Sequence, residues 1–404
     1  MFNTLRSAGA LAVTLAAAGI LMITMGVRQS VGLFVGPINT STGLGIATIS
    51  FAFAVAQFTW GAIQPIAGAA ADRWGARAVL AAGVLLLALG MALTPLVGTG
   101  AGLVFTQGLL MAMGAGAGAF SVLIGAAARR LPAEARGPAA GVINAGGSLG
   151  QFVFAPVAQK LIQWFGWMGA MGALAAISLA ALPLVGQVSK GGPAAPAPAA
   201  GEQGLRAAVR GALGDRSYLL LHAGFFTCGF HIAFLVTHLP TEVDLCGLPA
   251  SVASWSLALI GLANIVGSLW VGHLMGQCRS KTILAVMYAS RALLIAWYLL
   301  MPREPWVFYV FAVGLGLSWL ATVPPTAGIV GKLFGVRYLG TLFGLTLLSH
   351  QTGGFLGAWL GGLAVTRFGD YTWMWWADIA LAALAAVLNL PIREAPVKPA
   401  PAAA

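Results

Sequence analysis

The chain consists of apolar runs that are each long enough to cross a lipid bilayer. About 20 residues of helix span the hydrocarbon core. Twelve such runs follow one another: 8–36, 46–71, 78–98, 101–127, 137–160, 165–188, 217–240, 252–274, 281–301, 305–330, 337–362 and 371–390. Backbone groups in lipid must be satisfied within the chain, and no alternating ten-residue barrel pattern is present. We therefore expect an all-α membrane protein with twelve transmembrane helices.

The composition excludes an ordinary soluble protein. Charged residues make up 8% of the 404 residues, hydrophobic residues make up 59%, and the mean hydropathy is +0.90. Soluble domains carry about 25% charged residues. The net charge of +11 does not indicate nucleic-acid binding, because Lys and Arg lie in short loops and form no basic stripe with aromatic residues. The three cysteines show no metal-ligand spacing, and we expect no cofactor.

The distribution of Lys and Arg predicts the orientation. One side of the predicted membrane holds sixteen of these residues, and the other holds only Lys160, Arg303 and Arg367. Cytoplasmic loops carry the excess of positive charge. We therefore expect a multi-pass protein of the bacterial inner membrane, with both termini in the cytoplasm.

A hydrophilic, Ala/Pro-rich stretch at 189–216 divides the chain. It is typical of a flexible linker, and we expect a short amphipathic segment at 204–213. The predicted organisation is an N-terminal six-helix bundle at 1–188, the cytoplasmic linker at 189–216, a C-terminal six-helix bundle at 217–392 and a cytoplasmic tail at 393–404.

The two halves carry matching motifs. The loop after the second run reads Gly68-x-x-x-Asp72-Arg73-x-Gly75-x-Arg77, and a partial copy with Arg279 and Lys281 follows the eighth run some 204 residues later. At an offset of 207, Asn144, Gly146, Gly147 and Gly150 match Gln351, Gly353, Gly354 and Gly357. Two pseudo-symmetric six-helix repeats are common in secondary transporters, which hold substrate near mid-membrane between the repeats.

These motifs resemble the major facilitator superfamily. The 68–77 loop is the most specific match, and the Arg136-Gly137 start of the fifth run extends the likeness over nearly the whole chain. Within the superfamily, residues 26–34 and 228–234 resemble bacterial members near the monocarboxylate transporters, although Asn264 and Ser268 stand where those carry an acid and an arginine. The resemblance implies alternating access and a central cavity lined by helices 1, 4, 7 and 10.

Three full charges, Arg28, Arg291 and Asp378, lie well inside predicted spans, where a charge is costly unless it is paired or hydrated. Arg28 in the first helix is a candidate to bind a carboxylate through two hydrogen bonds; the alternative is an arginine that contacts neighbouring carbonyls. We expect Arg291 and Asp378, in the ninth and twelfth helices, to form a structural ion pair. The alternative is that Asp378 takes a transported proton.

Uncharged and weakly basic side chains inside the spans are further candidates. His231, in the seventh helix, could couple a proton to substrate or bond to a backbone carbonyl. The other candidate substrate-binding residues can orient a polar substrate or hold two helices together: Gln29, Gln57, Asn144, Gln151, Asn264, His350 and Gln351.

Two features are expected to act in gating. Asp72, Arg73 and Arg77 can form a latch between cytoplasmic helix ends, which is the role the resemblance implies for this loop. Pro324 and Pro325 remove hydrogen bonds inside the tenth run and predict a kink there.

Together these features predict a secondary active transporter. We expect it to move a small organic anion, a monocarboxylate, by alternating access with a proton, as a monomer in the lipid bilayer. The alternative is efflux of small apolar or cationic compounds, although Gly150 lacks the following proline that drug–proton antiporters carry. A sensor or an enzyme is disfavoured, because no catalytic or metal-ligand constellation and no nucleotide loop is present in the sequence.

Overall fold

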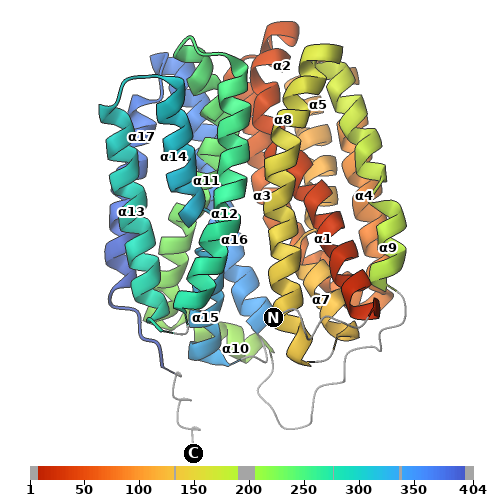
Figure 1. The fold of residues 1–404 in the computed structure, drawn as a ribbon, viewed down its shortest axis with the longest axis vertical. Helices are drawn as coiled ribbons and strands as arrows, with labels where there is room; N and C mark the ends of the chain where they lie inside the picture. The colour runs from red at the N-terminus through yellow and green to blue at the C-terminus, as the bar shows by residue number, and fades with distance from the viewer. Residues whose placement is uncertain (1–7, 132, 190–204, 276, 336–338, 396–404) are drawn as a thin grey trace, which may run out of the picture.

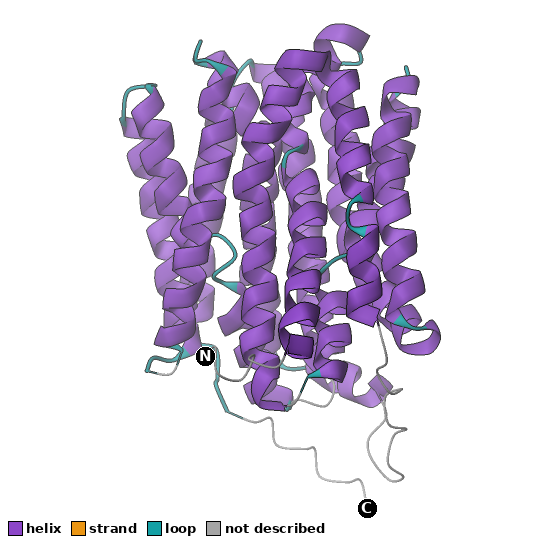
Figure 2. Cartoon of the chain, turned by 45° about the vertical axis from the view of Figure 1, so that its right-hand side comes forward, coloured by secondary structure: helices purple, strands orange, loops and turns teal. Residues whose placement is uncertain are grey.

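The described part of the chain is entirely helical. The computed structural model describes residues 8–131, 133–189, 205–275, 277–335 and 339–395, and Figure 2 shows them as helices joined by short loops. The elements of the first half are α1 Ala8–Gln29, η2 Val31–Phe34, α2 Val35–Thr42, α3 Ile46–Trp74, α4 Ala76–Leu93, η3 Thr94–Leu96, α5 Gly100–Leu103, η4 Val104–Met111, α6 Ala112–Ala117, α7 Phe120–Arg130, α8 Ala133–Leu179 and α9 Leu182–Ser189.

The second half has fewer interruptions. Its elements are α10 Leu205–Leu213, α11 Arg216–Leu245, α12 Ala250–Leu274, α13 Ser280–Leu300, α14 Pro305–Ser318, α15 Val323–Phe334, α16 Leu339–Phe368 and α17 Thr372–Asn389. Helix α10 lies within the predicted linker. The exact boundaries of the two bundles stay a prediction, because residues 190–204 are outside the described part.

These elements make twelve crossings, as the sequence predicts. Among the described residues, ten stretches are long and apolar enough to span a membrane. One of them, Gly141–Val188, has 48 residues and reverses direction at Gly166, whose φ of 67° is outside the helical range. It therefore supplies two crossings, and Figure 1 shows the chain rising through α8 and returning to α9. The 30-residue α16 adds the twelfth crossing, since it is about 45 Å long.

The two halves stand side by side. Figure 1 shows the helices from α1 to α9 on the right and those from α11 to α17 on the left. Helix α1 begins and α17 ends at the same end of the molecule, which is also where α10 lies. This is the end that the charge distribution predicts to be cytoplasmic.

In the first half, α1 and α8 approach closely because glycines on α8 face the backbone of α1. A Cβ placed on Gly146 would lie 2.5 Å from the carbonyl oxygen of Ala18. A Cβ on Gly150 would lie 2.1 Å from the carbonyl oxygen of Met22. Both distances are far below van der Waals contact, so only glycine allows this approach.

In the second half, α11 and α16 repeat the same contact. A Cβ on Gly353 would lie 2.0 Å from the carbonyl oxygen of Phe226, and one on Gly357 would lie 2.1 Å from that of Phe230. These glycines are the sequence counterparts of Gly146 and Gly150. The internal repeat seen in the sequence is therefore a repeat of helix packing.

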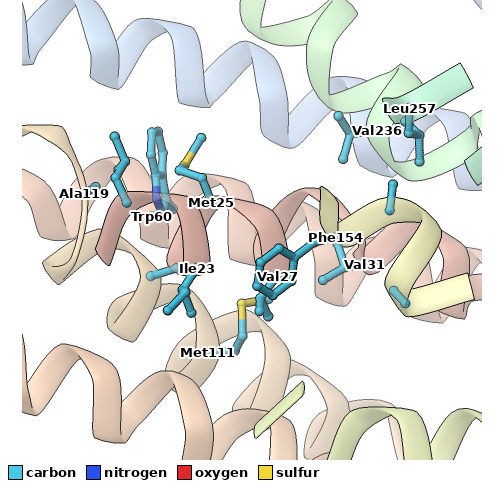
Figure 3. Packing of buried hydrophobic residues seen from close by; sticks show 14 of the residues in the cluster. Ile23, Met25, Val27, Val31, Trp60, Met111, Ala119, Phe154, Val236 and Leu257 are labelled. Carbon is cyan, nitrogen blue, oxygen red and sulfur yellow. The ribbon is translucent and has the colours of Figure 1, made fainter. Parts of the chain in front are cut away.

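The buried apolar side chains fill the remaining space between helices. Figure 3 shows Val27 of α1 among neighbours that include Met111 and Phe154, and each of these is at least 95% buried. The halves contact one another mainly through α3 against α16 and through α8 against α12. At the first of these contacts, a Cβ on Gly61 would lie 2.4 Å from Cγ of Gln351.

The glycine contacts predict a sharp dependence on side-chain size. We expect Gly150→Ala and Gly357→Ala each to destabilise the purified protein by about 1–3 kcal/mol, because the added methyl group must push two backbones apart. Gly172→Ala is the control, since a Cβ there meets no atom within 4 Å. Thermal unfolding in detergent measures the effect. Equal melting temperatures for all three variants would contradict the close approach.

Candidate functional site

A cavity of about 280 Å³ lies between the two halves. The first half contributes α1, α3, α7 and α8, and the second contributes α11, α15, α16 and the segment between α14 and α15. Its volume is close to the lower end of the range for small-molecule sites. Residues from both halves line it: Met25, Arg28, Gln29, Gln57, Trp60, Phe120, Ile124, Gly141, Asn144, Phe225, Gly229, Ile232, Ala233, Trp319, Leu320, Val323, Pro324, Phe343, Leu347, His350 and Gln351.

Arg28 carries a full positive charge at the wall of the cavity. It lies at the end of α1, donates a hydrogen bond to the side-chain oxygen of Gln57, and places its guanidinium 4.2 Å from the ring centre of Trp60. No acidic side chain of the described residues pairs with it. Gln57 and Trp60 both come from α3, and they hold the guanidinium at the cavity wall without neutralising its charge.

The second half places polar groups in the same cavity. His350 and Gln351 are adjacent on α16, and both are buried. Nδ1 of His350 has no hydrogen-bond partner among the described residues, and the same holds for Nε2 of Gln29 on α1. A buried polar atom without a partner is costly, so these atoms can bind a polar ligand in the cavity.

Aromatic rings make up much of the remaining wall, and the sequence analysis did not identify them. They are Trp60, Phe120, Phe225, Trp319 and Phe343. In the sequence they stand among many other aromatic residues in apolar runs, so no local pattern marks them as cavity residues. They give the site an apolar body beside the charge of Arg28.

Two predicted substrate-binding residues lie at the contact between the halves, and one of them, Asn264, bonds helices together. Asn264 of α12 donates to Oγ of Ser148 on α8 at 2.8 Å and accepts from the backbone N–H of Leu320 at 2.9 Å. Gln151 of α8 is buried and faces Gly261 of α12. Neither residue lines the cavity. The structure supports the alternative role of interhelical contact for Asn264, whereas Nε2 of Gln151 has no hydrogen-bond partner among the described residues.

The predicted ion pair between Arg291 and Asp378 is wrong in its partners. Asp378 of α17 forms a hydrogen-bonded pair with Nδ1 of His231 on α11, and both side chains are fully buried. Arg291 of α13 instead donates to the carbonyl oxygens of Ser318 at 2.8 Å and Trp319 at 3.4 Å. The carboxylate takes the imidazole as its partner, while the guanidinium satisfies backbone acceptors that no helical N–H reaches.

The helix predicted to kink at Pro324 is interrupted just before that residue. Helix α14 ends at Ser318 and α15 begins at Val323, with Pro324 and Pro325 in its first turn. Prolines fit a first turn because its N–H groups have no helical partner. Trp319, Leu320 and Pro324 line the cavity, so this interruption forms part of the cavity wall. Pro325 is buried and does not line the cavity.

The comparisons with known proteins match this architecture. The family model described as "Major Facilitator Superfamily" matches residues 16–358, which is most of the chain. The chain belongs to the Major Facilitator Superfamily. It is therefore a membrane transporter and not an enzyme.

Three known proteins that are similar to this chain share 14–28% of its sequence where they align. The "Uncharacterized MFS-type transporter YcxA" of Bacillus subtilis is 28% identical over 179 residues, which cover 42% of this chain and 43% of that protein. A crystal structure titled as a D-xylose-proton symporter has a TM-score of 0.74 at 15% identity, covering 95% of this chain and 98% of that one. A bacterial homologue of the human lysosomal transporter Spinster has a TM-score of 0.71 at 14% identity, covering 95% of both chains. The two structures show the shared fold.

The loop that marks the superfamily in this sequence is only partly described. Arg77 is exposed in the first turn of α4, next to Gly75, whose φ of 88° lets the chain turn between α3 and α4. The side chains of Asp72 and Arg73 lie outside the described residues. Their latch role stays a prediction.

The hydrogen bonds of Asn264 can be tested for their contribution to the stability of the protein. We expect Asn264→Leu to destabilise the protein by about 1–3 kcal/mol, because the buried N–H of Leu320 and the hydroxyl of Ser148 both lose a partner. Ser268→Ala on the same helix is the control, since the Ser268 hydroxyl makes no hydrogen bond to a described residue. Thermal unfolding should separate the two variants. An unchanged melting temperature for Asn264→Leu would contradict a structural role for these hydrogen bonds.

Proposed function

We propose that this transporter moves a small organic anion, specifically a monocarboxylate, by alternating access together with a proton. The observation that carries the proposal is Arg28, a guanidinium in the cavity that no described acid neutralises. An unpaired charge is costly within a membrane, and an anionic substrate removes that cost. The resemblance of residues 26–34 and 228–234 to bacterial relatives of the monocarboxylate transporters supports the same class.

The rest of the cavity supports a molecule with one anionic end and an apolar body. Opposite Arg28, the second half offers His350 and Gln351, and aromatic rings such as Trp319 and Phe343 surround them. A single carboxylate can bond to Arg28 and Gln29 while its hydrocarbon part contacts the rings. The cavity volume of about 280 Å³ restricts the substrate to a small molecule.

Because Arg28 and His350 come from different halves, one substrate would contact both. A ligand that bridges the halves can favour one arrangement of the two bundles over the other, which is the requirement for alternating access. A solved structure of this fold is titled a proton symporter, so the fold is compatible with proton coupling. We place the transporter in the bacterial inner membrane as a monomer, with both termini in the cytoplasm.

A thermal-shift experiment tests the substrate class. Purified protein is heated with acetate, pyruvate, benzoate and a set of apolar amines, at acidic and at neutral pH. A ligand that binds only the folded state raises its apparent stability by mass action. We expect at least one carboxylate to raise the melting temperature. A response to the amines alone would favour efflux of cationic compounds.

Variants of Arg28 test the carboxylate contact. Loss of a charge-assisted hydrogen-bonded pair costs about 1.5–3 kcal/mol, so Arg28→Ala should weaken carboxylate binding by about 10- to 100-fold. Arg28→Lys should keep part of the affinity, because it keeps the charge but loses the planar fork. Arg367→Ala is the control, since Arg367 is exposed at the end of α16. Undiminished binding by a folded Arg28→Ala protein would contradict the contact.

A further inference from the structure

A second polar cluster lies in the C-terminal half, outside the lining of the substrate cavity. Its centre is the hydrogen-bonded pair of His231 on α11 and Asp378 on α17, with both side chains fully buried. Each partner has one further atom, Nε2 of His231 and Oδ1 of Asp378, without a hydrogen-bond partner among the described residues. The pair therefore retains capacity for another proton or another contact.

The titratable and charged groups that surround the pair come from three helices. From α13, Arg291 lies within electrostatic range of Asp378, and its guanidinium is 5.6 Å from the ring centre of Tyr288. Cys228 lies one turn before His231 on α11, and His350 of α16 lies within electrostatic range of Cys228. Arg291 donates to Sγ of Cys228 at 3.4 Å. Nε of Arg291 also has no partner among the described residues.

Arg291 connects this cluster to the wall of the substrate cavity. Helix α14 ends at Ser318, so its last carbonyls have no helical donor. One amino group of Arg291 takes that place by donating to the carbonyls of Ser318 and Trp319. The ring of Trp319 lines the cavity and lies 6.1 Å from the imidazole of His231, centre to centre. A displacement of Arg291 would therefore remove two of the hydrogen bonds that hold the segment between α14 and α15.

We propose that His231 and Asp378 form the proton site of this transporter, and that Arg291 transmits the charge of that site to the interruption between α14 and α15. The inference rests on the proton coupling included in the proposed function. Beyond that coupling, we infer that the proton binds at His231 and Asp378 and that the segment between α14 and α15 responds to it.

The charge of the pair decides where Arg291 binds. With a proton bound, the imidazolium and the carboxylate together carry no net charge, and the guanidinium stays on the carbonyls of Ser318 and Trp319. When the proton leaves, the pair carries one negative charge in a fully buried position. Oδ1 of Asp378 then attracts the guanidinium away from the carbonyls. Proton loss thus releases the cavity wall, and proton binding restores it.

Cys228 reports on this movement, because its thiol is fully buried against Arg291 and Thr322. The test uses the full chain with Cys246→Ser and Cys278→Ser, so that Cys228 is the remaining cysteine. Its alkylation by N-ethylmaleimide is timed from about pH 6 to about pH 8, on both sides of neutral pH. Rates are divided by those of Asp378→Asn at each pH, which removes the ordinary effect of pH on a thiol.

We expect substitutions of Asp378 and His231 to have opposite effects on the reactivity of Cys228. Asp378→Asn removes at every pH the negative charge that would attract Arg291, so it should keep Cys228 protected throughout. His231→Gln leaves Asp378 to attract Arg291 and should make Cys228 reactive throughout. With both residues present, the corrected rate should rise about tenfold across the range, a factor that corresponds to about 1.4 kcal/mol. Asp370→Asn, a change at an exposed loop residue, should behave like the unsubstituted chain.

A corrected rate that stays constant with pH would overturn the proposal. So would equal reactivity of Asp378→Asn and His231→Gln, since general loosening of the bundle would affect both alike. The assay contains no carboxylate, and the Arg28 experiment contains no change at Asp378. Failure of the anion proposal and failure of the proton-site proposal are therefore distinguishable.

Discussion

Inside a bilayer the chain has no water to satisfy its polar groups, and this constraint accounts for most of what is seen here. Each backbone N–H and C=O must find a partner within the protein. Helices meet the requirement along their length, and side chains must meet it wherever a helix stops. Arg291 and Asn264 do so on the two sides of the interruption between α14 and α15, one by donating to carbonyls and the other by accepting from the N–H of Leu320.

The need of each buried polar group for a partner also distinguishes residues that hold the helices together from residues that can bind substrate. Asn264 has its polar atoms paired with described neighbours, and it lies at a contact between helices. Arg28, Gln29 and His350 retain charge or polar atoms without a described partner, and all three line the cavity between the halves. The substrate supplies the missing partner in our account. Because these residues come from both bundles, the site exists only where the two bundles face each other.

The fold was largely predictable from the sequence, because its signals are local. Runs of apolar residues predicted the twelve crossings, and the matched glycines around Gly146 and Gly353 predicted that the halves repeat. The partners of buried charges were not predictable, since they depend on three-dimensional neighbours. Asp378 was expected beside Arg291 because the ninth and twelfth helices are neighbours in the resembled fold, yet His231 reaches it from α11. The aromatic residues of the cavity wall could not be predicted from the sequence for the same reason. Trp319 differs from other buried tryptophans only in facing the cavity.

Transport into proteoliposomes is the most direct test of whether the protein moves a carboxylate together with a proton. Purified protein is reconstituted, a pH gradient with an acidic exterior is imposed, and accumulation of labelled acetate, pyruvate and benzoate is followed with and without a protonophore. Empty liposomes correct for passive entry of the protonated acids. We expect protein-dependent accumulation of at least one carboxylate, and we expect the protonophore to abolish it. Accumulation of none of them, together with pH-driven movement of organic cations, would contradict the proposed function.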